Sequence, residues 1–195
     1  MRYFAGLLLL VPLTLAAAQP IANGGGAEDG WISHLGILLG ARSMTDGAWN
    51  SADTQLGVGF MYDIRDDGAV PGVCPVGLEL GFMFNNSDEE SWKVQGYEVS
   101  VGAQYPWVLS RDHELFASVG GLVTTINLVN RNADYKERDT TFGAYLRAGY
   151  RWTFNEEWAL SAEGRGSLTG NLDFPNGEEA TASALGAFLG FAYRM

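Results

Sequence analysis

Five charged residues of this sequence occupy positions where they could pair with one another away from water. Glu79, Glu98, Arg147, Glu163 and Arg165 each stand between apolar or small residues, in stretches that alternate apolar with polar or small side chains. Carboxylates and guanidinium groups tolerate burial when they pair, whereas an unpaired buried charge is costly. We therefore predict that these five side chains form a polar network on one face of a sheet.

The sequence offers no pattern for a metal or cofactor site. Acidic residues cluster in turn-rich segments, but they lack the ligand spacing of a calcium-binding loop. The single cysteine, Cys74, is neither in a Cys-x-x-Cys motif nor beside a histidine, so we expect a free thiol. We expect no cofactor, no metal, and hydrated acidic loops. The loop acids are Asp88, Glu89, Glu90, Asp173, Glu178 and Glu179.

The segments that must hold the charged side chains have the pattern of β-strands. From Trp31 onward, apolar residues alternate with polar or small ones, which indicates strands with one apolar face. Eight such segments are separated by turn-forming clusters, and each is long enough to cross a bilayer as a tilted strand. The predicted strands cover roughly residues 31–43, 53–64, 76–85, 93–107, 114–128, 140–154, 157–170 and 182–195. Both faces of the fifth are mostly apolar, so its orientation stays open.

The N-terminal region has the layout of a secretory signal peptide over residues 1–18. Arg2 precedes an apolar stretch, and Ala16, Ala17 and Ala18 provide small side chains for cleavage. Residues 19–30, which include three consecutive glycines, are predicted to be a flexible leader. Residues 31–195 then form one domain without a transmembrane helix. The formal net charge of −11 argues against nucleic acid as a partner, because phosphate binding needs a basic face.

The predicted connections alternate between long and short. The first set is 45–52, 85–91, 130–139 and 171–179, and the second is 65–74, 110–113 and 155–156. Outer-membrane barrels alternate longer external loops with short periplasmic turns. The first set therefore falls outside the cell, and both ends of the barrel lie in the periplasm. Segment 65–74 departs from the pattern, because it is as long as the external loops.

Alternation alone does not distinguish a membrane barrel from a soluble lipocalin-like barrel, whose apolar face points inward. Two features favour the membrane. The polar face carries glycine, serine, threonine and matched Glu and Arg, while the only lysines, Lys93 and Lys136, lie in or beside loops. Aromatic residues gather near the strand ends, as in the girdles that border the apolar band of a transmembrane barrel. They are Trp31, Tyr62, Tyr105, Trp107, Tyr150, Trp152, Trp158 and Tyr193 at the periplasmic end, and Phe84, Tyr97 and Phe142 at the external end.

Only helices and closed barrels satisfy their backbone hydrogen bonds in lipid. The sequence therefore predicts an all-β protein: a closed, eight-stranded, antiparallel, up-and-down transmembrane β-barrel. Its narrow interior leaves space for side chains alone, so we interpret the five charged residues as a plug of ion pairs that fills the lumen. A gated path for small solutes is the alternative interpretation.

The last strand supports a resemblance to a known family. Leu185, Leu189, Phe191 and Tyr193 share a face with Ala187 and Met195, which resembles the C-terminal signal read by the barrel-assembly machinery. Over residues 31–195 the chain resembles the small OmpA-type and OmpX-type barrels, although that family usually ends in phenylalanine or tryptophan. The resemblance implies a monomer in the outer membrane of a Gram-negative bacterium, surrounded by lipid and lipopolysaccharide. It also implies a structural or surface-interaction role through four external loops.

Enzymatic activity is a further alternative, because PagL-type lipid A deacylases are also eight-stranded barrels. Those enzymes use a His-x-Ser pair on one face of a strand, where the imidazole activates the hydroxyl. This sequence has only two histidines: Leu35-Gly36 follows His34, and Glu114-Leu115 follows His113. Neither histidine has a serine two residues further on, so we predict no catalytic residue. His34 is expected to face the lumen, and His113 to lie in a solvated turn.

Overall fold

The computed structural model describes residues 31–47, 49, 53–66, 76–89, 92–130, 135–173 and 179–195. The predicted signal peptide, the leader and Cys74 lie outside the described residues and stay predictions. In the part of the chain that the structure describes, no helix has the length and apolarity needed to cross a bilayer.

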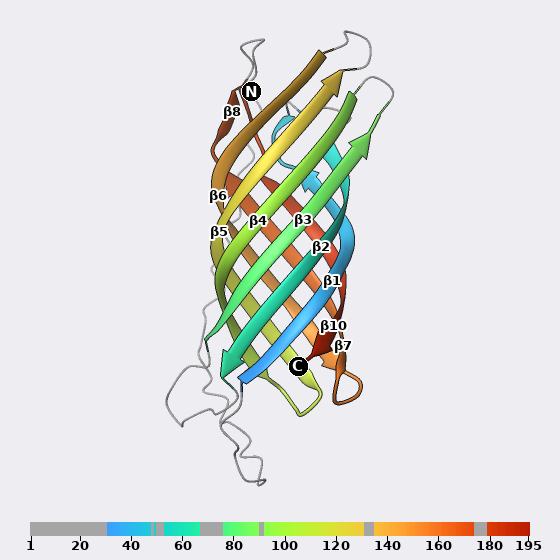
Figure 1. Cartoon of the computed structure of the whole chain (residues 1–195), viewed down its shortest axis with the longest axis vertical. Coiled ribbons are helices and arrows are strands. Elements are labelled where there is room, and N and C mark those ends of the chain that lie inside the picture. Colours follow the sequence, from blue (N-terminus) through green and yellow to red (C-terminus); the bar gives the residue numbers. More distant parts are fainter. Residues whose placement is uncertain are drawn as a thin grey trace, which may run out of the picture.

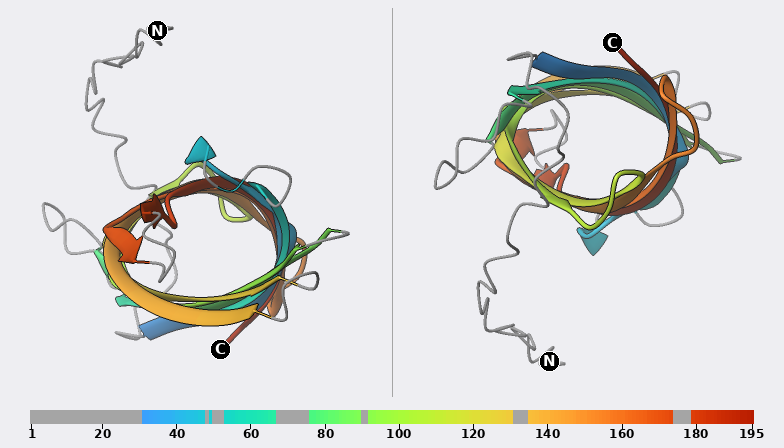
Figure 2. Two further views of the ribbon diagram at one scale, coloured as in Figure 1. Left: turned by 90° about the horizontal axis from the view of Figure 1, so that it is seen from above. Right: turned by 90° about the horizontal axis from the view of Figure 1, so that it is seen from below.

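Eight antiparallel strands form a closed barrel, which Figure 1 shows from the side and Figure 2 from its two ends. Each strand pairs with its neighbours in sequence, apart from the small sheet β8–β9 described below, and β1 pairs with β10 from His34–Arg194 to Met44–Ala184. This last ladder removes the sheet edges, as a membrane requires. The barrel strands are β1 (Trp31–Met44), β2 (Thr54–Asp66), β3 (Gly77–Asp88), β4 (Trp92–Val108), β5 (His113–Asn130), β6 (Tyr135–Thr153), β7 (Trp158–Thr169) and β10 (Ala184–Arg194).

The two faces of the wall follow the alternation of the sequence. On β6, Leu146 points outward and is 62% exposed, whereas the next residue, Arg147, points into the lumen and is 3% exposed. The structure also shows the orientation of β5, which the sequence left open. Phe116 and Ile126 face inward, and Val119 faces outward. The polar and small residues thus line the lumen, and the Leu- and Val-rich face covers the outside.

The two ends of the barrel differ. At one end, tight turns join β4 to β5 and β6 to β7, with hydrogen bonds from Leu109 N to His113 O (2.9 Å) and from Phe154 N to Trp158 O (3.1 Å). We call this the short-turn end. At the other, extended end, β4, β5 and β6 have 17, 18 and 19 residues, more than the roughly 9–11 that cross a bilayer. These strands project as a wall, because β5 and β6 stay paired beyond Gly143, where the pairing of β6 with β7 stops.

Several loop boundaries predicted from the sequence are wrong. Residues 85–88 continue β3, and 135–139 continue β6, although both stretches are rich in polar and turn-forming residues. Outside the hydrocarbon region a strand needs no apolar face, so paired polar residues can extend it. Likewise, His113 is the first residue of β5 rather than part of a turn.

A small two-stranded sheet, which begins in the predicted loop 171–179 and ends just beyond it at Thr181, was also missed. β8 (Asn171–Asp173) pairs with β9 (Glu179–Thr181) in register Asn171–Thr181 to Asp173–Glu179. Figure 1 shows β8 beside β6 at the extended end. Because β9 takes up residues 179–181, the last barrel strand begins at Ala184 rather than at residue 182.

Candidate functional site

The lumen is filled by charged side chains, and the densest group surrounds Glu79 of β3. Its carboxylate accepts hydrogen bonds from Ser118 Oγ (2.8 Å), Tyr145 OH (2.8 Å) and Gln104 Nε2 (3.3 Å), and from Arg147 Nη1. Arg147 also donates from Nε to Glu163 Oε2 at 2.8 Å. These groups, which we call the central cluster, bring together three of the five predicted network residues.

Two facing glycines make room for the central cluster. Gly102 of β4 and Gly120 of β5 are paired across the sheet, and the Tyr145 ring lies over them on the lumen side. A Cβ on Gly102 would lie 2.3 Å from the Tyr145 hydroxyl, and a Cβ on Gly120 would lie 2.7 Å from Tyr145 Cε1. The missing side chains therefore allow the tyrosine to reach Glu79.

A second group, the outer cluster, lies nearer the extended end around Glu98 of β4. Its carboxylate accepts from Arg165 Nη2 and from Arg42 Nη1, the latter at 3.3 Å. Arg42 also donates from Nε to Gln55 Oε1 at 2.9 Å. The Arg165 guanidinium lies 4.3 Å from the centre of the Tyr145 ring, so this cluster adjoins the central one.

A third group, the basal cluster, lies towards the short-turn end. Arg151 donates to Asp63 Oδ2 at 2.8 Å and to Glu114 Oε1 at 3.2 Å. His34 Nδ1 lies 2.9 Å from Asp63 Oδ1, and Arg65 pairs with Glu114. The buried Phe116 ring separates this cluster from the central one, with Arg147 and Arg151 at 4.7 and 5.2 Å from its centre.

Positive and negative groups balance within these three clusters. Five arginines pair with five carboxylates: Arg42, Arg65, Arg147, Arg151 and Arg165 with Asp63, Glu79, Glu98, Glu114 and Glu163. Balance of this kind is expected, because an unpaired charge in a narrow, poorly hydrated interior would be costly. The excess negative charge of the chain therefore lies outside the clusters.

Apolar side chains fill the lumen at the extended end. Val94 of β4, Ile126 of β5 and Leu172 of β8 are fully buried against one another. Trp49 adds its ring and donates from Nε1 to Thr181 O at 2.7 Å, which ties the β8–β9 sheet to the barrel. We call this group the apolar cap; its members are Met44, Trp49, Val94, Ile126, Leu172, Ala180, Ala182 and Ala184.

All five predicted network residues point into the lumen, but they divide between two clusters: Glu79, Arg147 and Glu163 in the central one, and Glu98 and Arg165 in the outer one. Sequence reasoning missed the others. The alternation along the strands could have indicated them, because each occupies a lumen-facing position of its strand. His34 was assigned correctly to the lumen, but its partners were not identified. The missed residues are Arg42, Gln55, Asp63, Arg65, Gln104, Glu114, Ser118, Tyr145 and Arg151.

Replacing Tyr145 with phenylalanine should remove one hydrogen bond to the Glu79 carboxylate while preserving the ring. A hydrogen bond to a charged group contributes about 1.5–3 kcal/mol, so we expect the free energy of unfolding to fall by that amount. Urea titration of the barrel in lipid vesicles, followed by tryptophan fluorescence, measures it. Tyr97→Phe, which changes an exposed outward ring, serves as the control and should leave the midpoint unchanged.

The lumen clusters hold charges in fixed pairs rather than presenting reactive groups. The His34 ring nitrogen Nδ1 is engaged with Asp63, and Glu79 already accepts four hydrogen bonds. Within the described ranges, no group of three or more His, Cys, Asp or Glu side chains is placed to hold a metal ion.

A closed antiparallel barrel with a charged lumen and an apolar outer face defines a transmembrane β-barrel of the outer-membrane class. Residues 5–194 match the family model described as the outer membrane protein beta-barrel domain, and the chain belongs to this family. It is accordingly a protein of the bacterial outer membrane. A search of curated proteins found no match.

Solved structures agree on the fold. OprG from Pseudomonas aeruginosa is similar, with a TM-score of 0.59, 14% identity, and 87% of this chain and 98% of that one covered. Neisserial surface protein A gives 0.58 at 10% identity, covering 85% and 96%. Ail, the attachment invasion locus protein of Yersinia pestis, solved with the heparin analogue sucrose octasulfate, gives 0.57 at 15% identity, covering 85% and 99%. None of these three is named as an enzyme.

Proposed function

We propose that this protein is a non-enzymatic surface-interaction protein whose extended end contacts a partner outside the cell. The observation that carries the proposal is the contrast between a filled lumen and a projecting rim. We use rim for the part of the extended end that lies beyond the length a bilayer needs. The three clusters and the apolar cap occupy the interior, whereas β4, β5 and β6 continue beyond the length that a bilayer needs. Long strands around a filled lumen favour a role in contact rather than transport.

The charge of the rim indicates what kind of partner fits. Five acidic residues lie at the extended end outside the buried clusters: Asp88, Glu89, Asp139, Asp173 and Glu179. The basic residues of the described strands at this end are Lys93, Lys136 and Arg138. Complementary charges steer partners together and suppress wrong ones. A partner with basic groups therefore suits this rim, in contrast to the sulfated ligand found with Ail.

Binding to an immobilised polylysine peptide tests this proposal, with the protein held in nanodiscs of uncharged phosphatidylcholine. The double variant Glu89→Gln and Asp173→Asn, both at exposed positions, should bind several-fold more weakly than the unchanged protein. A matched control, Glu156→Gln and Glu157→Gln, removes the same charge from the exposed short-turn end and should bind nearly as well. Equal losses in the two variants, or detectable binding of sucrose octasulfate, would refute a rim that selects basic partners.

A narrow channel is the alternative function that the sequence left open. The filled lumen supports the expectation that the protein in a planar bilayer gives no conductance steps above background. Stable, repeated steps that disappear when the protein is omitted would instead favour the channel.

A further inference from the structure

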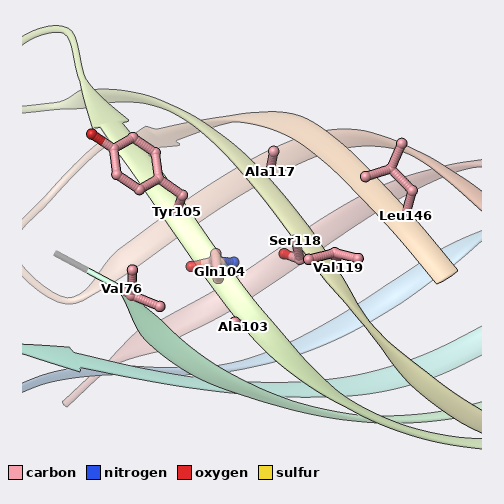
Figure 3. A pocket seen from close by; sticks show the side chains of 8 residues that line it. All are labelled: Val76, Ala103, Gln104, Tyr105, Ala117, Ser118, Val119 and Leu146. Atoms are coloured by element: carbon pink, nitrogen blue, oxygen red, sulfur yellow. The ribbon is translucent and has the colours of Figure 1, made fainter. Parts of the chain in front are cut away.

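The outer face of the barrel has a hollow near the short-turn end, which Figure 3 shows from close by. It lies over β4, β5 and β6, with Val76 at its margin just before β3, and has a volume of about 300 Å³. The outward side chains that line it are those of Val76, Ala103, Tyr105, Ala117, Val119 and Leu146.

The hollow arises from small side chains set between larger ones. Across β4 and β5, Ala103 is paired with Val119, and Tyr105 with Ala117. On the far side, Val119 is paired with Leu146 of β6. The two alanines thus form a floor, while the tyrosine stands at one end and the valine and leucine at the other (Figure 3).

Hydrocarbon is the medium that this hollow meets. It is continuous with the lipid-facing surface, on which Val119 and Leu146 are 60% and 62% exposed. Apart from the hydroxyl of Tyr105, the outward side chains that line it are apolar, so an acyl chain can lie in it without burying a charged group. We propose that one acyl chain of a phospholipid occupies the hollow as a bound lipid, distinct from the freely exchanging lipid around the barrel.

The position of the hollow identifies the leaflet. Tyr105 and Trp107 pack edge to face near the end of β4, beside the tight turn that leads to β5, and their ring centres are 4.6 Å apart. Tyrosine and tryptophan mark the level of the lipid headgroups, and short turns mark the periplasmic side of such barrels. The bound chain therefore belongs to a glycerophospholipid of the periplasmic leaflet, with its headgroup at the level of Tyr105. This site is independent of any partner at the extended end.

Filling the hollow should displace the lipid. The double variant Ala103→Leu and Ala117→Leu places larger apolar side chains on its floor without changing the character of the surface. Native mass spectrometry would be carried out on detergent-solubilised protein after incubation with palmitoyl-oleoyl phosphatidylethanolamine. We expect the unchanged protein to retain one phospholipid, and the filled variant to lose it at several-fold lower collision energy. Tyr105→Phe keeps the ring and should weaken retention less.

A matched control places the same side chains elsewhere on the lipid-facing wall. Ala162→Leu and Ala187→Leu change exposed alanines of β7 and β10, away from the hollow, and should retain phospholipid as the unchanged protein does. Folding is verified by the heat-dependent gel shift, and Ala117→Leu alone carries the test if the double variant does not fold. The proposal is overturned if both double variants behave alike, or if the hollow retains lipid A in preference to phospholipid.

Discussion

Replacing Arg147 with methionine should lower the free energy of unfolding by about 3–5 kcal/mol, the usual cost of removing one partner from a buried ion pair. The guanidinium of Arg147 is buried and joins two carboxylates, those of Glu79 and Glu163. Methionine keeps much of the volume against Phe116 but removes the charge, so both carboxylates lose their cation. Urea unfolding in lipid vesicles measures the loss.

Two further variants separate charge from packing. Adding Glu79→Gln and Glu163→Gln to Arg147→Met removes the stranded charges and should recover part of the stability. Arg111→Ala breaks the pair with Glu156, whose side chains are 78% and 90% exposed, and should change the midpoint little. If Arg147→Met proved no more damaging than Arg111→Ala, the central cluster would not stabilise the barrel.

Replacing Gly120 with valine should destabilise the barrel by more than about 3 kcal/mol, at the upper end of what overpacking costs. A Cβ at this position would lie 2.2 Å from Val101 O and 2.6 Å from Gly102 Cα, both of them backbone atoms. Neither can move without opening the ladder between β4 and β5. We expect a large loss of folded protein, measured by the fraction that shows the heat-dependent gel shift after refolding.

The neighbouring glycine provides the control. Gly121 faces outward, and a Cβ there would meet only Gly143 O, at 3.9 Å. Gly121→Val therefore should fold with nearly normal yield. Similar yields for the two valine variants would show that close approach of the backbone at Gly120 does not constrain this barrel.

The faces of the strands could be predicted from the sequence because side chains alternate along a strand with a period of two. Arg147 and Arg165 stand next to Leu146 and Gly166, and this parity alone assigns them to the lumen. β5 also alternates, but its two faces could not be told apart, because the inward Phe116 and Ile126 are as apolar as the outward Val119. In a filled lumen, apolar residues can occupy either face, so hydropathy does not distinguish the two.

The partners within each cluster could not be predicted, because they depend on register around the barrel. Glu79 of β3 meets Arg147 of β6, and Arg42 of β1 meets Glu98 of β4. Such contacts cross the lumen between strands that are not neighbours, and no local pattern specifies them. Parity does reveal candidates such as Asp63 and Arg151.

The apolar cap was missed for a different reason. β8 and β9 have three residues each, which is too short for a periodic signal. Leu172 is isolated among polar and turn-forming residues, so nothing in its surroundings indicates that it packs on Val94 and Ile126. Only the closure of the barrel brings these side chains together.

In the cell, hydrocarbon is the solvent of the Leu- and Val-rich outer face. Analytical ultracentrifugation of the chain expressed from Gln19, transferred from detergent into plain buffer, tests it most directly. We predict rapid association into large aggregates, because side chains such as Leu146 and Leu168, 62% and 75% exposed, then face water. A folded monomer that persists in buffer without detergent or lipid would contradict the account.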